Sequence, residues 1–136
     1  MGRRCGDRPR RTLYPALPGF VALSGGALVG HASYRLEGDR CELASIEAAP
    51  AGEGIGSALL AAVVEAARAA GCRTLWCTTT NDNLDALAFY QRRGFRLSAL
   101  RPGAVDEARA TRKPEIPLVA PNGLPLRDEL DLALAL

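Results

Sequence analysis

The feature that most constrains the fold of this chain is a glycine-rich turn that runs directly into an apolar segment with helical spacing. The turn and the first helical residues read Gly52-Glu53-Gly54-Ile55-Gly56-Ser57-Ala58-Leu59-Leu60. Glycines let a backbone approach a bulky anion without Cβ clashes, and a helix N-terminus adds unpaired N–H groups. The stretch therefore predicts a phosphate or pyrophosphate site. A tight loop whose glycines serve only turn geometry explains the turn, taken alone, equally well.

Length and composition predict one soluble domain. The chain has 136 residues, of which 48% are hydrophobic and 24% charged, as is ordinary for a globular protein. No stretch approaches the ~18 uninterrupted apolar residues of a membrane span. No apolar segment follows the basic first residues, so we expect a cytoplasmic protein without a membrane partner. A formal net charge of +2 is too small to argue for nucleic acid as a partner.

The cysteines and the single histidine do not form a metal-ligand pattern. Cysteines stand at positions 5, 41, 72 and 77, and no pair has the C-x2-C spacing of common zinc sites. His31 has no ligand partner nearby in the sequence. Cys77 and Cys72 lie in an apolar run and are interpreted as small buried hydrophobic residues. We expect neither a metal nor a disulfide framework.

The order of the expected elements places the glycine turn after a meander. An irregular basic arm is expected over 1–18 and a single domain over 19–136. Alternation and turn residues predict strands over 20–23, 27–36, 40–47, 73–80, 95–100 and 130–136. Helical spacing predicts helices over 56–71 and 84–93, a short helix or turn over 102–113, and an irregular proline-rich connection over 114–125. The first three strands form an antiparallel meander, and the helix after them crosses over to the fourth strand.

Two motifs in this order carry a family resemblance. The glycine turn opens a helix, and one strand later the chain reads Asn81-Asp82-Asn83-Leu84-Asp85-Ala86-Leu87-Ala88-Phe89-Tyr90-Gln91-Arg92-Arg93-Gly94-Phe95. Over about residues 19–136 the chain resembles the GNAT family of acetyl-CoA-dependent N-acetyltransferases. The resemblance implies an α/β (α+β) domain with a mixed, mostly antiparallel sheet, helices on both faces and a splayed central strand pair.

The resemblance also implies acetyl-CoA as co-substrate, with no metal. Its pantetheine arm would pair with the strand edge around Ile46, and Asn83 would contact it. Asn83 is equally suited to cap a helix, and Ser57 to fill a first helical turn. The cofactor's pyrophosphate would rest on the backbone amides of Gly52, Glu53, Gly54, Ile55, Gly56 and Ser57.

The chemistry that the resemblance implies is direct attack of a neutral amine on the thioester. Tyr90 matches the family's usual acid at the cofactor sulfur, and its alternative role is a core aromatic beside Phe89. The base is Glu42 or Glu47, both on the strand before the glycine turn. Strand alternation puts these two carboxylates on opposite faces unless a bulge intervenes, and the family commonly has one there. The alternative for either is a solvated carboxylate.

Two departures from the family pattern keep other functions open. Ala51 stands where the family has Arg or Gln, and Glu53 puts an acid inside the expected anion site. Residues 1–18 do not supply the usual strand and helices that wall the acceptor site. The expected function is transfer of acetyl to a primary amine of a small molecule or peptide. The alternatives are a silent acyl-CoA-binding module, or an N-terminally truncated fragment that needs a partner chain. A homodimer is one arrangement left open.

Overall fold

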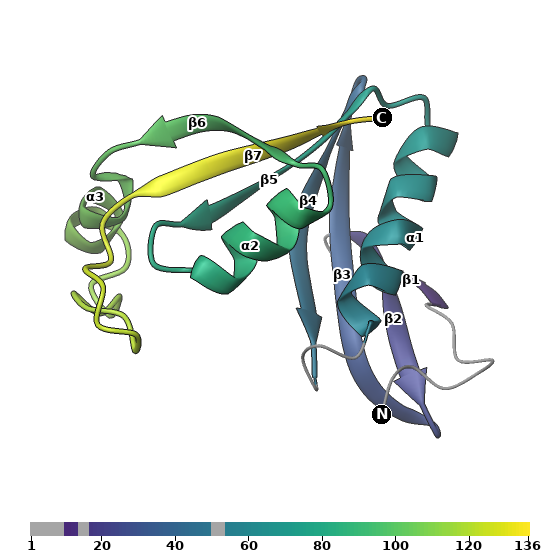
Figure 1. Cartoon of the computed structure of the whole chain (residues 1–136), viewed down its shortest axis with the longest axis horizontal. Helices are drawn as coiled ribbons and strands as arrows, with labels where there is room; N and C mark the ends of the chain where they lie inside the picture. Colours follow the sequence, from purple (N-terminus) through teal and green to yellow (C-terminus); the bar gives the residue numbers. More distant parts are fainter. Residues whose placement is uncertain (1–9, 14–16, 50–53) are drawn as a thin grey trace. The chain divides into compact units, whose positions relative to one another are not determined.

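The computed structural model describes residues 10–13, 17–49 and 54–136, with the backbone alone described for 10–13. These residues fall into two compact units (Figure 1). The first lies within residues 1–75 together with 135–136, and the second spans 76–134. Strands and helices are present in both units, as expected for a mixed α+β fold with mostly antiparallel strand pairs.

The first unit is an antiparallel meander followed by one helix. Its strands neighbour one another in chain order. The elements are β1 (Arg10–Leu13), β2 (Pro18–Ser24), β3 (Ala27–Glu37), β4 (Arg40–Ala48) and α1 (Ile55–Ala69). The structure confirms the expected meander and the helix after the glycine turn. It also confirms the turns between the strands, at Gly25-Gly26 and Gly38-Asp39.

The expectation that residues 1–18 are irregular is wrong for part of that range. Arg10–Leu13 forms β1, which pairs with β2 from Leu13 opposite Pro18 to Arg10 opposite Val21. Proline is tolerated at the first residue of a strand, and Pro18 occupies that position in β2. The prolines therefore flank this strand pair instead of breaking it.

The apolar stripe of α1 packs onto the meander because one strand residue has no side chain. Ile55 and Leu59 of α1 are both buried. A Cβ placed on Gly30 of β3 would lie only 2.9 Å from the Ile55 Cγ2 and 3.0 Å from the Leu59 Cδ1. Gly30 thus allows the first turns of α1 to approach the strands closely. On the other side of the helix, Glu65 and Arg68 are exposed, as the helical spacing predicts.

The second unit combines strands with two helices. Within it β7 lies between β5 and β6, and β6 pairs with β7 in antiparallel fashion. The alternating leucines at the end of the chain lie in β7, where Leu132 is fully buried. The elements are β5 (Thr74–Thr80), α2 (Leu84–Arg92), β6 (Arg96–Arg101), α3 (Ala104–Thr111) and β7 (Glu129–Ala135).

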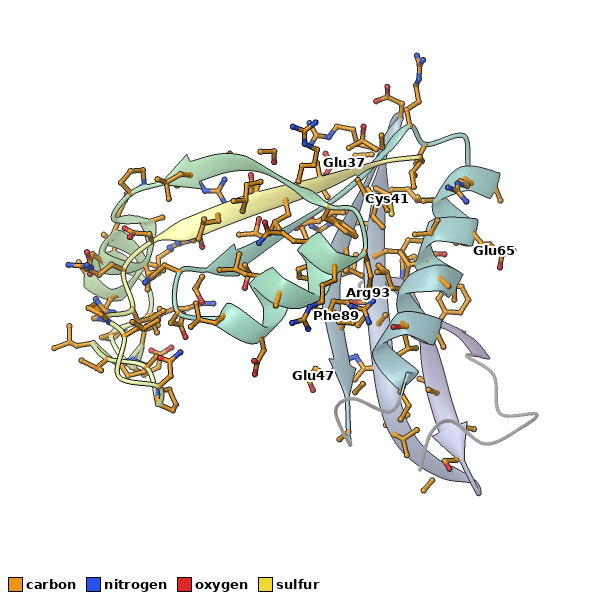
Figure 2. All side chains as sticks on the ribbon, in the orientation of Figure 1. Glu37, Cys41, Glu47, Glu65, Phe89 and Arg93 are labelled. Carbon is orange, nitrogen blue, oxygen red and sulfur yellow. The ribbon has the colours of Figure 1, made fainter. Side chains whose placement is uncertain are left out.

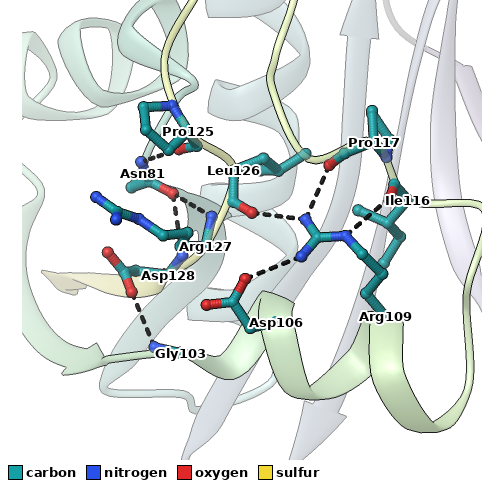
Figure 3. A network of polar contacts seen from close by, with 10 residues as sticks. All are labelled: Asn81, Gly103, Asp106, Arg109, Ile116, Pro117, Pro125, Leu126, Arg127 and Asp128. Atoms are coloured by element: carbon teal, nitrogen blue, oxygen red, sulfur yellow. Dashed lines mark hydrogen bonds and ion pairs between the residues drawn. The ribbon is translucent and has the colours of Figure 1, made fainter.

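The proline-rich connection between α3 and β7 is irregular, as predicted, and is held by side-chain hydrogen bonds (Figure 3). Arg109 of α3 donates to three backbone carbonyls of this connection, at distances of 2.7–2.9 Å. These carbonyls belong to Ile116, Pro117 and Leu126. Asn81 fastens the other end, because its Oδ1 accepts from the N–H groups of Arg127 and Asp128. One cation thereby fixes the path of a segment that has almost no regular secondary structure.

The described ranges contain neither a membrane-spanning helix nor a metal-binding cluster. No helix in them is long and apolar enough to cross a membrane. No group of three or more His, Cys, Asp or Glu side chains in the same ranges is arranged to hold a metal ion.

Candidate functional site

The glycine turn leads into the N-terminal end of α1. Gly54, the N-cap residue, has a left-handed backbone (φ 78°) and carries no side chain that could cap the helix. The first helical hydrogen bond runs from the Ala58 N–H to the Gly54 carbonyl at 3.0 Å. The amides of Ile55, Gly56 and Ser57 therefore precede the helical ladder, at the positive end of the helix dipole. Gly52 and Glu53, predicted to line the same site, lie outside the described residues.

Side chains around this helix end differ in what they can offer. The Ile55 side chain is 1% exposed and packs into the core, so only its backbone amide is placed to meet an anion. Ser57 is half-buried in the first turn of α1. None of the residues in this first turn is acidic.

The strand before the turn carries the predicted base candidates. A register shift between Ser33 and Tyr34 of β3 leaves Ala44 of β4 as an extra residue, which is a β-bulge. The bulge puts Glu42 and Glu47 on the same face of the sheet. Their partners on β3 are Arg35 and His31, which are an even number of residues apart and therefore lie on one face of that strand. Ile46, predicted to pair with the cofactor, is half-buried and lies opposite Ala32 on the other face.

The face that bears both carboxylates is polar along the whole strand pair. We call its four cross-strand pairs the polar ladder: Glu37–Arg40, Arg35–Glu42, Ser33–Ser45 and His31–Glu47. The opposite face carries the buried residues Ala32, Tyr34, Cys41 and Leu43. Gly30 also lies on that opposite face, where its missing side chain leaves room for α1.

Contacts within the polar ladder distinguish the two carboxylates. The Arg35 Nη1 donates to the Glu42 Oε1 at 2.6 Å, and the Glu42 side chain is only 21% exposed. The Glu47 Oε2 lies 3.5 Å from the His31 Nε2, and the Glu47 side chain is 79% exposed. Glu42 is thus held by a permanent cation, whereas Glu47 faces a side chain that can lose its charge. Figure 2 shows Glu47 toward the arrowhead end of β4.

The predicted residues of the second unit lie on one helix. Asn83 is the N-cap of α2, and its Oδ1 accepts from the Ala86 N–H at 3.1 Å. Its capping role is therefore present, and its side-chain amide nitrogen has no protein partner within the ranges that the structure describes. The contact of Asn83 with a cofactor stays a prediction.

Tyr90 is the only fully buried residue of α2 among those the structure describes, and its phenol faces a thiol. Its ring packs against Phe89 and Phe95, with centroids 5.3 and 5.2 Å away. The Cys77 thiol of β5 is the polar neighbour of its hydroxyl. Burial, and then the neighbouring Cys77, raise the pKa of Tyr90 above its ordinary value. Burial also raises the pKa of Cys77 to about 12. Both groups consequently stay protonated near neutral pH.

Phe89, the neighbour of Tyr90, points to a different side of α2. The Arg93 guanidinium lies 3.7 Å from the centre of the Phe89 ring, and its Nη1 donates to the Phe89 carbonyl. Both side chains are labelled in Figure 2. The two aromatic residues therefore do not share one core face, as the 100° step between helical neighbours predicts.

Sequence reasoning missed the partners of two predicted residues. His31 lies far from Glu47 in the sequence, and only the strand register brings them together. Counting back from the Gly38-Asp39 turn without the extra residue Ala44 would place His31 opposite Ile46 instead. Cys77 was correctly expected to be buried, but its contact with Tyr90 had no signal in the sequence. The first unit thus holds the N-terminal end of α1 and the polar ladder, and the second holds Asn83 and Tyr90.

Comparison with known proteins adds independent information. The family model of the acetyltransferase (GNAT) family matches residues 3–95. The protein YdhI of Bacillus subtilis (strain 168) is 45% identical over 115 residues, which are 84% of this chain and 71% of YdhI. Streptothricin acetyltransferase of Streptomyces lavendulae is 38% identical over 97 residues, which are 65% of this chain and 51% of that protein. The chain therefore corresponds to only part of the length of each of these relatives.

A solved structure supports the same fold. The crystal structure of a GNAT family acetyltransferase from Elizabethkingia anophelis, with acetyl-CoA bound, superposes with a TM-score of 0.77 at 22% identity. The superposition covers 89% of this chain and 77% of the other. With the fold, the glycine turn and the family match in agreement, the chain belongs to the GNAT family of acetyltransferases.

Proposed function

We propose that this protein is an N-acetyltransferase that moves acetyl from acetyl-CoA to a primary amine of a small molecule or peptide. The observation that carries the proposal is the start of α1 directly behind the left-handed Gly54. In a member of an acetyltransferase family, the backbone amides of such a helix start are suited to the pyrophosphate of coenzyme A. The acetyl-CoA bound in a structure of the same fold supports this choice of co-substrate.

In the proposed reaction a neutral amine attacks the thioester carbonyl, and the tetrahedral intermediate then expels the thiolate of coenzyme A. The departing thiolate needs a proton, and Tyr90 is the proposed donor. Its phenol keeps its proton throughout the neutral range and is therefore present in the acid form. The strand edge at Ile46 and the side chain of Asn83 are the proposed contacts for the pantetheine arm.

The similarity to streptothricin acetyltransferase makes streptothricin a reasonable first acceptor to test. Peptides with a free N-terminus and simple diamines complete a primary-amine panel. We place the reaction in the cytoplasm, which cell fractionation would test. The oligomeric state, with a homodimer as one candidate, is open to measurement by size-exclusion chromatography with light scattering.

The decisive experiment is calorimetric titration with acetyl-CoA, followed by a thiol-release assay across the amine panel. Gly54→Ala should weaken acetyl-CoA binding about tenfold. A left-handed backbone is strained for alanine by about 1–2 kcal/mol, and relief of this strain would move the backbone amides at the start of α1. Gly123→Ala is the matched control: it has a similar φ (88° against 78°) and no atom within 4 Å of the added Cβ in either case. Absence of acetyl-CoA binding by the parent protein would overturn the proposal. Binding without turnover on any amine would favour a silent acyl-CoA-binding module.

A further inference from the structure

The last pair of the polar ladder lies where β4 ends and α1 begins. Glu47 is the penultimate residue of β4, and the Ala49 N–H donates to the Val29 carbonyl at 2.9 Å, which closes the strand pair. A Cβ on Gly30 would meet the Glu47 carbonyl at 2.8 Å and the Ile55 side chain at 2.9 Å. The backbone that carries Glu47 is therefore adjacent to the first turn of α1, the proposed pyrophosphate site.

The pair combines a proton acceptor with a group that can orient it. The His31 Nε2 lies 3.5 Å from the Glu47 Oε2, and the His31 side chain is 33% exposed. A carboxylate beside one ring nitrogen favours the tautomer with the proton on that nitrogen. In neutral imidazole the other nitrogen, here Nδ1, then has a free lone pair. Imidazole is also the side chain that most often acts as a general base near neutral pH.

The other pairs of the polar ladder lack this combination. Glu42 faces the Arg35 guanidinium, which cannot release its proton and therefore cannot accept one. Ser33 and Ser45 hydrogen-bond each other through their hydroxyls at 2.6 Å. His31 is the only histidine of the chain. A neutral nitrogen base beside a carboxylate thus occurs once along this face.

We propose that His31 is the proton acceptor for the amine substrate and that Glu47 is its positioning residue, an inference that rests on the proposed acetyl transfer. The substrate ammonium gives one proton to the His31 Nδ1, which yields a neutral amine and an imidazolium. The amine's lone pair then forms the new C–N bond and the C–S bond breaks. The nitrogen gives up its second proton to solvent, which balances the proton that the leaving thiolate takes up. The imidazolium, stabilised by Glu47, returns its proton to solvent through its exposed edge.

The test is chemical rescue of His31→Ala with free imidazole, using the best amine found for the parent protein. The partly exposed position should accept added imidazole. We expect turnover to fall at least about 20-fold and to recover several-fold with imidazole, since general-base catalysis is typically worth 10²–10⁴-fold. Glu37→Gln is the matched control: it removes a carboxylate from the same face of β3, at the opposite end of the polar ladder. This control should keep full turnover and show no response to imidazole.

A second readout concerns Glu47 and needs no turnover. Because the chain has one histidine, its ring ¹⁵N signals can be assigned without ambiguity by NMR. The parent should show the Nε2–H tautomer, and Glu47→Gln should shift the population toward Nδ1–H. Unchanged turnover of His31→Ala, or loss of turnover without imidazole rescue, would overturn the base role. Both turnover outcomes can be observed only if the parent protein is active. An inactive parent that still shows the Nε2–H tautomer would count against the proposed function alone.

Discussion

The Arg35 guanidinium lies 2.6 Å from the Glu42 carboxylate, across the β3–β4 pair. The Glu42 carboxylate is thus already engaged by a permanent cation. Glu42 and Glu47 of β4 were both candidates for the base. This contact distinguishes them, because Glu47 has no such arginine partner in the described structure.

Glu42→Gln should therefore have little effect on catalysis. We expect a change in kcat of less than about threefold, together with a loss of unfolding free energy of up to about 1 kcal/mol, the usual range for a partly exposed ion pair. Steady-state kinetics and urea denaturation measure the two effects. A loss of kcat greater than tenfold with normal stability would return Glu42 to the list of bases.

Tyr90→Phe tests the proposed acid while leaving the ring in place. The variant should lose about 10²-fold in kcat, the lower end of what a general acid contributes. Acetyl-CoA affinity should stay near the parent value because the aromatic packing against Phe89 and Phe95 is retained. The unfolding free energy should fall by about 1 kcal/mol or less, since the polar contact of the hydroxyl with Cys77 is lost.

Thiol release and calorimetry on the same sample provide the measurement for Tyr90→Phe. Gln91→Ala is a suitable control, because Gln91 is exposed on the same helix and its side chain donates to the Leu87 carbonyl of that helix. Parent-like turnover of Tyr90→Phe on every amine would assign Tyr90 to the core alone.

Much of the fold could be predicted because its signals are local. The Gly25-Gly26 and Gly38-Asp39 turns, the spacing of α1 and the alternating leucines of β7 each identify an element without reference to the rest of the chain. β1 was missed because Pro9 and Pro15 suggest an irregular course, whereas both lie outside the four residues that pair.

The candidate site could be predicted only in part, because its contacts depend on register. Alternation along β4 left the relative faces of Glu42 and Glu47 open, and the extra residue Ala44 decides them. The same residue brings His31 opposite Glu47. A contact such as Tyr90 to Cys77 joins a helix to a strand, and nothing in the spacing of the two residues encodes it.

Gly30→Ala should destabilise the first unit. The new Cβ would lie 2.8–3.0 Å from three atoms, and one of these is the backbone oxygen of Glu47, which cannot rotate away. Overpacking of this kind typically costs about 1–3 kcal/mol. Chemical denaturation measures the loss. Gly38→Ala is the control, because its added Cβ would meet no atom within 4 Å and the substitution would test only the backbone strain of a left-handed position. A parent-like stability of Gly30→Ala would show that α1 shifts freely on the sheet.

Arg109→Ala should loosen the connection between α3 and β7. Its guanidinium is 14% exposed and donates to three carbonyls, and a hydrogen bond to a charged group is worth about 1.5–3 kcal/mol. We expect a loss of about 2–3 kcal/mol in stability and faster proteolytic cleavage within residues 114–126. Arg112→Ala, at the exposed end of the same helix, is the control. Cleavage at the parent rate would contradict the role given to Arg109.

Stability should decline in alkali because two buried thiols hold their protons. Burial raises the pKa of Cys41 from 9.0 to about 11 and that of Cys77 from 9.0 to about 12. The unfolded chain releases these protons near pH 9, so between pH 9 and about 11 the folded state binds more protons than the unfolded state. The free energy of unfolding must then fall as pH rises through this window.

Urea midpoints measured from pH 8 to pH 11 would give the slope of this decline. Cys41→Ala should flatten the slope between pH 9 and 11, while lowering stability at pH 8 by a constant amount for the lost packing. The comparison of slopes removes that constant loss, along with contributions from other titrating groups that both proteins share. An identical slope in the two proteins would mean that the Cys41 thiol ionises as readily in the folded state as in the unfolded chain.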